Sequence, residues 1–212
     1  GRCAGGGGPR VMPRPEHVPG RVLVPGTGRP APEEGVAFYR AAGFSAEALA
    51  AYTRRFGSFG RVIAPMPDSY VRIVEGDELT IGGEDWRVTV GSGHSPEHAC
   101  LWNTDRKLFI SGDQILPRIS SIVSVWPTEP HADPLRDWLD SCARLQQLLP
   151  ADTLILPAHG DPFTGVHLRL DQLIDEHTHN LDSLRAALDR PLRAVDTFTA
   201  LFKRPVDRDS QV

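Results

Sequence analysis

The chain has 212 residues, which suffices for one domain with a sizeable core, or for one domain with an appendage. With 40% apolar and 24% charged residues it is typical of a globular protein, and its net charge of −4 disfavours nucleic acid as a partner. No long apolar run predicts a membrane span, and the three scattered cysteines indicate a reducing, cytoplasmic setting rather than a disulfide framework or a cysteine-rich zinc module.

Residues 1–32 differ in composition from the rest of the chain. They hold 15 of the 39 glycines and prolines, five arginines and one acidic residue, without helical or strand periodicity. Such a segment buries too little apolar surface to offset its ordering entropy, so we expect it to be disordered or loosely draped. The composition is also typical of a GC-rich gene read out of frame, and we hypothesise that the native frame resumes near residues 31–34.

Two alanine-rich helices are predicted next, over residues 33–42 and 45–56, with Gly43 between them and Ser45 as the N-cap of the second. Residues 61–69 are expected to connect them to a run of short strands. The predicted strands are residues 70–74 and 78–81, a return strand containing Trp86, Val88 and Val90, and residues 98–103 and 107–111.

A helix is predicted to begin at Asp133 and Pro134, because Asp is a favoured N-cap and Pro fits the first helical position. Pro150 should end it. A buried strand over 153–156, a long helix over 165–188 and a short helix near 197–202 complete the prediction. We therefore divide the chain into the segment 1–32, a domain over 33–165 and a helical segment over 166–212.

Three polar residues stand where predicted strands end. His94 follows the return strand, Asp113 follows the strand 107–111, and His159 follows the strand 153–156. Each has an ordinary interpretation when taken singly, since polar loop histidines and Gly-Asp turns are common. Together, two imidazoles and a carboxylate at the rim of a sheet indicate a metal site.

The motifs around these residues carry a family resemblance. GHSPEH (93–98), SGDQIL (111–116) and LPAHGDP (156–162) resemble, in this order, the third, fourth and fifth motifs of the metallo-β-lactamase-fold hydrolases. More narrowly, the chain resembles the branch of glyoxalase II-like thioester hydrolases and related small hydrolases with a helical, winged-helix-like C-terminal extension. The resemblance covers roughly residues 33–200.

The resemblance implies a layered α/β fold, an αββα sandwich with two metal ions, usually zinc, at one sheet edge. It implies that His94 binds the first metal, that Asp113 bridges both, and that His159 binds the second. Metal-bound hydroxide would then attack an ester, thioester or related bond of a small-molecule substrate. His98 is expected to orient the site or to meet substrate as a catalytic residue beside Asp113, or else to be a hydrogen-bonded histidine at the start of a strand. Asp161 would orient the His159 loop or serve as a turn residue.

One family motif is missing. The string HxHxDH, which supplies the remaining ligands, occurs nowhere in the chain, and His17 has no partner histidine. We therefore expect the N-terminal half of the sandwich to be incomplete, the metal occupancy to be low and the activity of this fragment to be impaired. The alternative is a degenerate, non-catalytic binding module of the same fold. A nuclease is disfavoured by the acidic charge, and the oligomeric state is left open.

Overall fold

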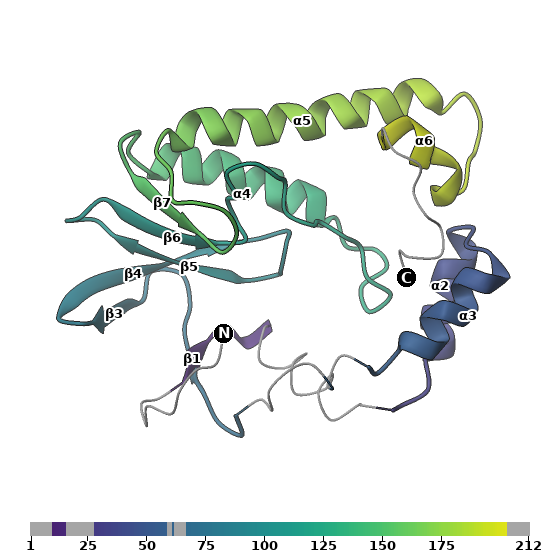
Figure 1. The fold of residues 1–212 in the computed structure, drawn as a ribbon, viewed down its shortest axis with the longest axis horizontal. Helices are drawn as coiled ribbons and strands as arrows, with labels where there is room; N and C mark the ends of the chain where they lie inside the picture. Colours follow the sequence, from purple (N-terminus) through teal and green to yellow (C-terminus); the bar gives the residue numbers. More distant parts are fainter. Residues whose placement is uncertain (1–9, 16–27, 59–60, 62–66, 203–212) are drawn as a thin grey trace. The chain divides into compact units, whose positions relative to one another are not determined.

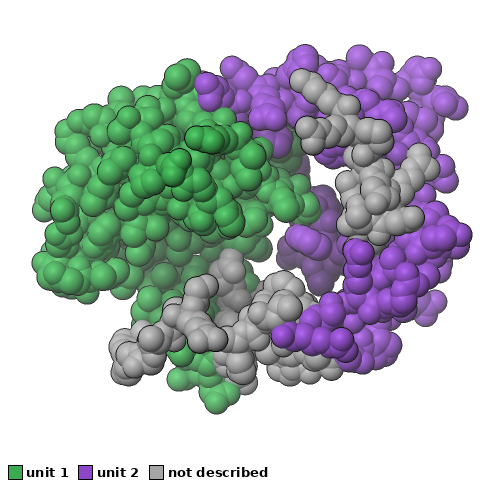
Figure 2. Space-filling model, viewed as in Figure 1, with its two compact units in different colours: residues 1–22, 64–124, 134–169 green, residues 23–63, 125–133, 170–212 purple. Residues whose placement is uncertain are grey.

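The computed structural model describes residues 10–15, 28–58, 61 and 67–202. His17 and most of the segment 1–32 lie outside these residues. The chain forms two compact units, coloured separately in Figure 2. Unit 1 comprises residues 1–22, 64–124 and 134–169, and unit 2 comprises residues 23–63, 125–133 and 170–212. The last of the divisions between the units, after residue 169, falls within one long helix.

Unit 1 is built on a five-stranded sheet with the strand order β3-β4-β5-β6-β7 (Figure 1). The first three pairs are antiparallel, and β6 and β7 are parallel. Gly82 and Gly83, with φ of +65° and +83°, form the turn between β3 and β4 that the sequence predicted. The strands are β3 (Glu78–Ile81), β4 (Glu84–Gly91), β5 (His98–Asn103), β6 (Leu108–Gly112) and β7 (Leu154–Pro157).

Helix α4 (Pro134–Leu148) makes the crossover between the parallel strands β6 and β7. Its predicted start at Pro134 is confirmed. One face of the helix is apolar and packs inward, since Trp138, Cys142 and Leu145 are fully buried. Val88 of β4, Phe109 of β6 and Ile155 of β7 are equally buried, and these side chains form the core of unit 1 together with those of α4. This core fixes the sheet to which the predicted site residues are attached.

A second, two-stranded sheet pairs β1 (Val11–Met12) with β2 (Val71–Arg72) in parallel. The sequence predicted no strand before residue 33, and for Val11 and Met12 that expectation is wrong. The main-chain N–H of Val71 donates to the carbonyl of Arg10, and that of Ile73 donates to the carbonyl of Met12. Backbone pairing with a distant strand, rather than local periodicity, creates β1.

Unit 2 contains α2 (Glu33–Ala41), α3 (Ala46–Arg55), the 3-10 helix η2 (Ala194–Thr197) and α6 (Phe198–Leu201). The predicted N-cap is confirmed, since Ser45 Oγ accepts from the N–H of Ala48 at 3.2 Å. The elements meet through ring contacts, including Tyr39 with Tyr52 at 4.8 Å between centroids and Phe44 with Phe198 at 6.4 Å. Burial raises the pKa of both tyrosines.

Helix α5 (Val166–Ala187) belongs to both units, its first residues to unit 1 and the remainder to unit 2. The predicted layered α/β class is confirmed by the helices and the mixed sheet. The domain boundaries at residues 32 and 165 stay predictions. Within the part of the chain that the structure describes, no helix is long and apolar enough to cross a membrane.

Candidate functional site

The predicted site residues follow strand ends at one end of the sheet. His94 follows β4, Asp113 follows β6 and His159 follows β7. Because β4 and β6 both run antiparallel to β5, and β7 runs parallel to β6, these three strand ends meet beside the start of β5. The first residue of β5 is His98. The topology therefore brings all four residues to one place.

His94 is oriented by the backbone of a different loop. Its Nδ1 atom lies 2.8 Å from the carbonyl oxygen of Ile122. Because a carbonyl only accepts, Nδ1 carries the proton and Nε2 keeps a lone pair in the neutral ring. Nε2 lies 3.6 Å from Oδ2 of Asp113. The preceding Gly93 has φ of +100° and passes so close to α4 that a Cβ there would lie 2.7 Å from Cα of Trp138.

Asp113 lies between two imidazoles. Its Oδ2 atom faces His94, and its Oδ1 atom lies 3.5 Å from Nε2 of His159. Both main-chain polar groups of Asp113 are hydrogen-bonded: the N–H donates to Nε2 of His98 at 3.2 Å, and the carbonyl accepts from the hydroxyl of Ser121. The carboxylate is therefore presented with one oxygen toward each histidine.

His159 is the most exposed of the three, with 72% of its side chain accessible against 28% for His94. Its loop is tied to the Asp113 loop, because the N–H of Ala158 donates to the carbonyl of Gly112 at 2.9 Å. Asp161 lies 3.9 Å from Arg118, and both side chains are almost fully exposed. Whether Asp161 orients the His159 loop or serves as a turn residue stays a prediction.

Sequence reasoning missed Arg169, a buried residue of α5 that holds the loop after Asp113. Its Nε donates to the carbonyl of Leu116 at 2.7 Å, and its Nη2 donates to that of Ile119 at 3.0 Å. No local pattern marks Arg169, because its partners lie about 50 residues earlier in the chain. The loop that it holds goes on to Ser121 and Ile122, which contact Asp113 and His94.

A buried glutamine, also missed, links the two strand-end loops. Gln114 is fully buried, and its Nε2 lies 3.3 Å from the carbonyl of Ser92 and 3.3 Å from the hydroxyl of Ser141 in α4. Ser92 precedes His94 by two residues, and Gln114 directly follows Asp113. The amide thus fixes the spacing of the two loops that carry the candidate ligands.

A groove of about 480 Å³ opens at the site and includes His94, Ser95, His98 and Asp113 in its wall. The rest of the wall is apolar and comes from β1, β3, β5 and the residues beside them. An apolar group could therefore lie next to the polar cluster. These apolar residues are Val11, Met12, Pro13, Ile73, Leu79, Ile81, Ala99 and Leu101.

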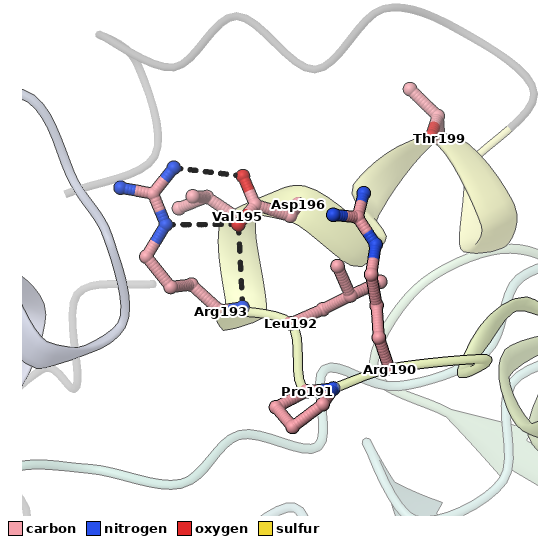
Figure 3. Close-up of a pocket in the computed structure, with 7 residues that line it drawn as sticks. All are labelled: Arg190, Pro191, Leu192, Arg193, Val195, Asp196 and Thr199. Atoms are coloured by element: carbon pink, nitrogen blue, oxygen red, sulfur yellow. Dashed lines mark hydrogen bonds and ion pairs between the residues drawn. The ribbon is translucent and has the colours of Figure 1, made fainter.

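Unit 2 has a separate depression of about 660 Å³, lined by residues of the segment 190–199 (Figure 3). Two arginines lie in its wall. Arg193 donates through Nε and Nη2 to the carboxylate of Asp196, at 2.9 and 3.0 Å, and Arg190 lies 3.8 Å from Asp189. Because each arginine has its own carboxylate, the depression offers little uncompensated positive charge for an anion.

The donor atoms of the candidate site fit part of a two-metal centre. Asp113 offers one oxygen to each side, and the Nδ1 bond of His94 is the arrangement that orients a ligating imidazole through Nε2. Each ion would thus receive one imidazole nitrogen and one carboxylate oxygen. Among the described residues, no group of three or more His, Cys, Asp or Glu side chains could hold a metal ion. Since zinc takes at least three protein ligands, this part of the chain supplies an incomplete set.

Comparison with known proteins identifies the family. The sequence model of the Metallo-beta-lactamase superfamily matches residues 14–159. A probable metallo-hydrolase of Bacillus subtilis (strain 168), YqjP, is 28% identical over 132 residues, which are 60% of this chain and 41% of the relative. A protein of Aquifex aeolicus (strain VF5) is 33% identical over 110 residues, 51% of this chain and 49% of the relative.

Two solved structures are also similar. A beta-lactamase domain protein from Burkholderia ambifaria is 35% identical, with a TM-score of 0.76 over 92% of this chain and 53% of its own. A metallo-beta-lactamase family protein from Thermus thermophilus is 26% identical, with a TM-score of 0.64 over 80% of this chain and 57% of its own. The chain therefore spans about half the length of the relatives it matches. Because the family model matches well over half of the chain, the chain belongs to the metallo-beta-lactamase superfamily.

Proposed function

We propose that this protein is a metal-dependent hydrolase that acts on an ester, thioester or related bond of a small molecule, with reduced activity in the 212-residue chain. The observation that carries the proposal is the position of Asp113, whose two carboxylate oxygens face Nε2 of His94 and Nε2 of His159 at 3.6 and 3.5 Å. Membership of a hydrolase superfamily, and the similarity to a probable metallo-hydrolase, support the reaction class.

His94 would hold the first metal ion, His159 the second, and Asp113 both. We propose zinc, because it combines readily with imidazole and carboxylate ligands. When bound, such ions lower the pKa of a water molecule, so that hydroxide is available near neutral pH. The protein's own contribution is to hold Asp113 by its main chain and His94 by Nδ1, so that both ligands are oriented before metal binding.

The apolar wall of the neighbouring groove supports a substrate with an apolar group beside the scissile bond, as in a thioester or ester of the glyoxalase II-like branch. We place the protein in the cytoplasm on the basis of its unpaired, buried cysteines, Cys100 and Cys142. The acidic net charge disfavours a nucleic-acid substrate.

A second candidate is a non-catalytic binding module of the same fold. It is favoured by the incomplete ligand set, because within the described ranges no three metal-binding side chains converge on one ion. A chain of this kind would fold without zinc and would leave both ester and thioester probes intact.

The test combines metal analysis with hydrolysis. The purified chain is equilibrated with zinc, its content is measured by mass spectrometry, and hydrolysis of p-nitrophenyl acetate and of acetylthiocholine is followed, with Asp113→Ala as the comparison. We expect zinc uptake at up to two ions per chain and slow hydrolysis that Asp113→Ala abolishes. A folded chain that takes up no zinc and hydrolyses neither probe would support the binding module instead.

A further inference from the structure

We propose that His98 is a positioning residue: its Nε2 atom accepts the main-chain N–H of Asp113 and thereby fixes the carboxylate between His94 and His159. The contact measures 3.2 Å between Asp113 N and His98 Nε2. The effect of this hydrogen bond on metal binding rests on the proposed function. The hydrogen bond itself is present without a metal ion.

The register of the sheet explains why these residues meet. In the antiparallel pair of β5 and β6, Leu101 lies opposite Ile110. Continuing that register by three residues beyond the end of the ladder places His98 opposite Asp113. The backbone pairing has ended there, so the N–H of Asp113 has no ladder acceptor on β5, and the imidazole supplies one.

The neighbouring glycine makes room for the ring. Gly112 has φ of +53°, and a Cβ at this position would collide with Nε2 of His98 and lie 3.1 Å from its Cε1. Only glycine allows both this backbone conformation and the close approach of the imidazole. The ring therefore lies against the main chain that leads into Asp113.

The hydrogen bond also defines the chemical state of His98. Since an N–H donor points at Nε2, this nitrogen carries the lone pair, and the proton of the neutral ring is on Nδ1. A lone pair used by the Asp113 amide cannot also coordinate a metal ion. The ring also touches the ring of His94 edge to face, with 5.8 Å between the centroids. The imidazole of His98 therefore contacts two candidate ligands, Asp113 and His94, but is not itself a ligand.

The contact is tested first without metal. In a ¹⁵N-labelled chain we expect a scalar coupling across the hydrogen bond between the Asp113 amide nitrogen and Nε2 of His98, and ring shifts that show the proton on Nδ1. Absence of the coupling in the wild-type chain, or a proton on Nε2, would overturn the proposal. The variant His98→Leu should lose the coupling and shift the Asp113 amide resonance upfield, as expected for a weaker hydrogen bond.

The consequence is tested by zinc affinity, measured by competition with a chelating dye. In His98→Gln the side-chain oxygen can accept the same N–H, so its affinity should stay within about three-fold of wild type, whereas His98→Leu should bind about ten-fold more weakly or worse. The control His179→Gln removes an exposed histidine of α5 and should bind like wild type.

The outcomes separate the positioning role of His98 from the proposed metal-dependent function. Equal affinity of His98→Leu and wild type would overturn the positioning role, and so would a loss in His98→Gln as large as that in His98→Leu, because the ring would then act as a ligand. If the wild-type chain binds no zinc, the proposed function fails, while the coupling measurement still decides whether His98 holds Asp113.

Discussion

The imidazole of His94 donates through Nδ1 to the carbonyl oxygen of Ile122, at 2.8 Å. The residue before Ile122, Ser121, donates its hydroxyl to the carbonyl of Asp113. Two consecutive residues of one loop thus hold two candidate ligands that come from different strands. This loop, rather than the sheet alone, determines how the imidazole and the carboxylate face each other.

Because Asp113 is shared, its removal should affect metal binding differently from the removal of one histidine. In a zinc titration by calorimetry we expect Asp113→Ala to weaken both binding events and His94→Ala to weaken one of them, each by at least about ten-fold. His131→Ala, an exposed loop residue, is the control. Identical titrations for Asp113→Ala and His94→Ala would contradict a bridging carboxylate.

Gly93 should tolerate no side chain. It has φ of +100°, and an added Cβ would lie 2.6 Å from the carbonyl oxygen of Pro134 and 2.7 Å from Cα of Trp138, both of which are backbone atoms that cannot rotate away. We expect Gly93→Ala to lower the free energy of unfolding by more than about 3 kcal/mol, through strain and overpacking together.

Gly165 provides the matched control for Gly93. Its φ is +85°, yet an added Cβ would meet no atom within 4 Å. Gly165→Ala should therefore cost about 1 kcal/mol, from backbone strain alone. Urea denaturation of both variants measures the difference, and similar losses would show that close packing at Gly93 contributes nothing.

Arg169 should be important for stability because it donates to one buried carbonyl group and to one partly buried carbonyl group. Replacement by methionine keeps the aliphatic stem but leaves the carbonyls of Leu116 and Ile119 without their donor. We expect a loss of about 3 kcal/mol in urea denaturation. The control is Arg118→Met, whose exposed ion pair with Asp161 at 3.9 Å should contribute no more than about 0.5 kcal/mol. Equal losses in the two variants would show that the contacts of Arg169 with these two carbonyl groups contribute little.

The two buried cysteines should be unreactive and should make stability depend on pH. Burial raises the pKa of the thiols of Cys100 and Cys142 to about 12. In a Cys3→Ser background, a thiol reagent at pH 8 should modify neither cysteine in the folded chain and both after unfolding. Rapid labelling under native conditions would contradict this.

The sign of the pH dependence follows from the same shift. In the unfolded chain the thiols release their protons near pH 9, whereas in the folded chain they stay protonated up to about pH 12. The unfolded state therefore binds fewer protons in this interval, and the free energy of unfolding should fall as the pH rises from 9 to 12. In Cys142→Ala the free energy of unfolding should fall less steeply over the same pH interval.

The sequence by itself determined the order of the strands and helices, the N-cap at Ser45 and the start of α4, because these features depend on local periodicity and capping chemistry. It also identified His94, Asp113 and His159 as strand-end residues, and the family. It did not predict β1, whose pairing with β2 joins segments about 60 residues apart.

Only the tertiary structure decided how the candidate ligands are held. The contacts of Asp113 with His98, of His94 with Ile122, and of Arg169 with Leu116 join residues that are 15, 28 and 53 positions apart. Such contacts leave no local pattern, because they depend on the register of β5 against β6 and on the path of the loop after Asp113. The sequence thus identified the candidate ligands, and the register of the sheet placed His98 against the main chain of Asp113.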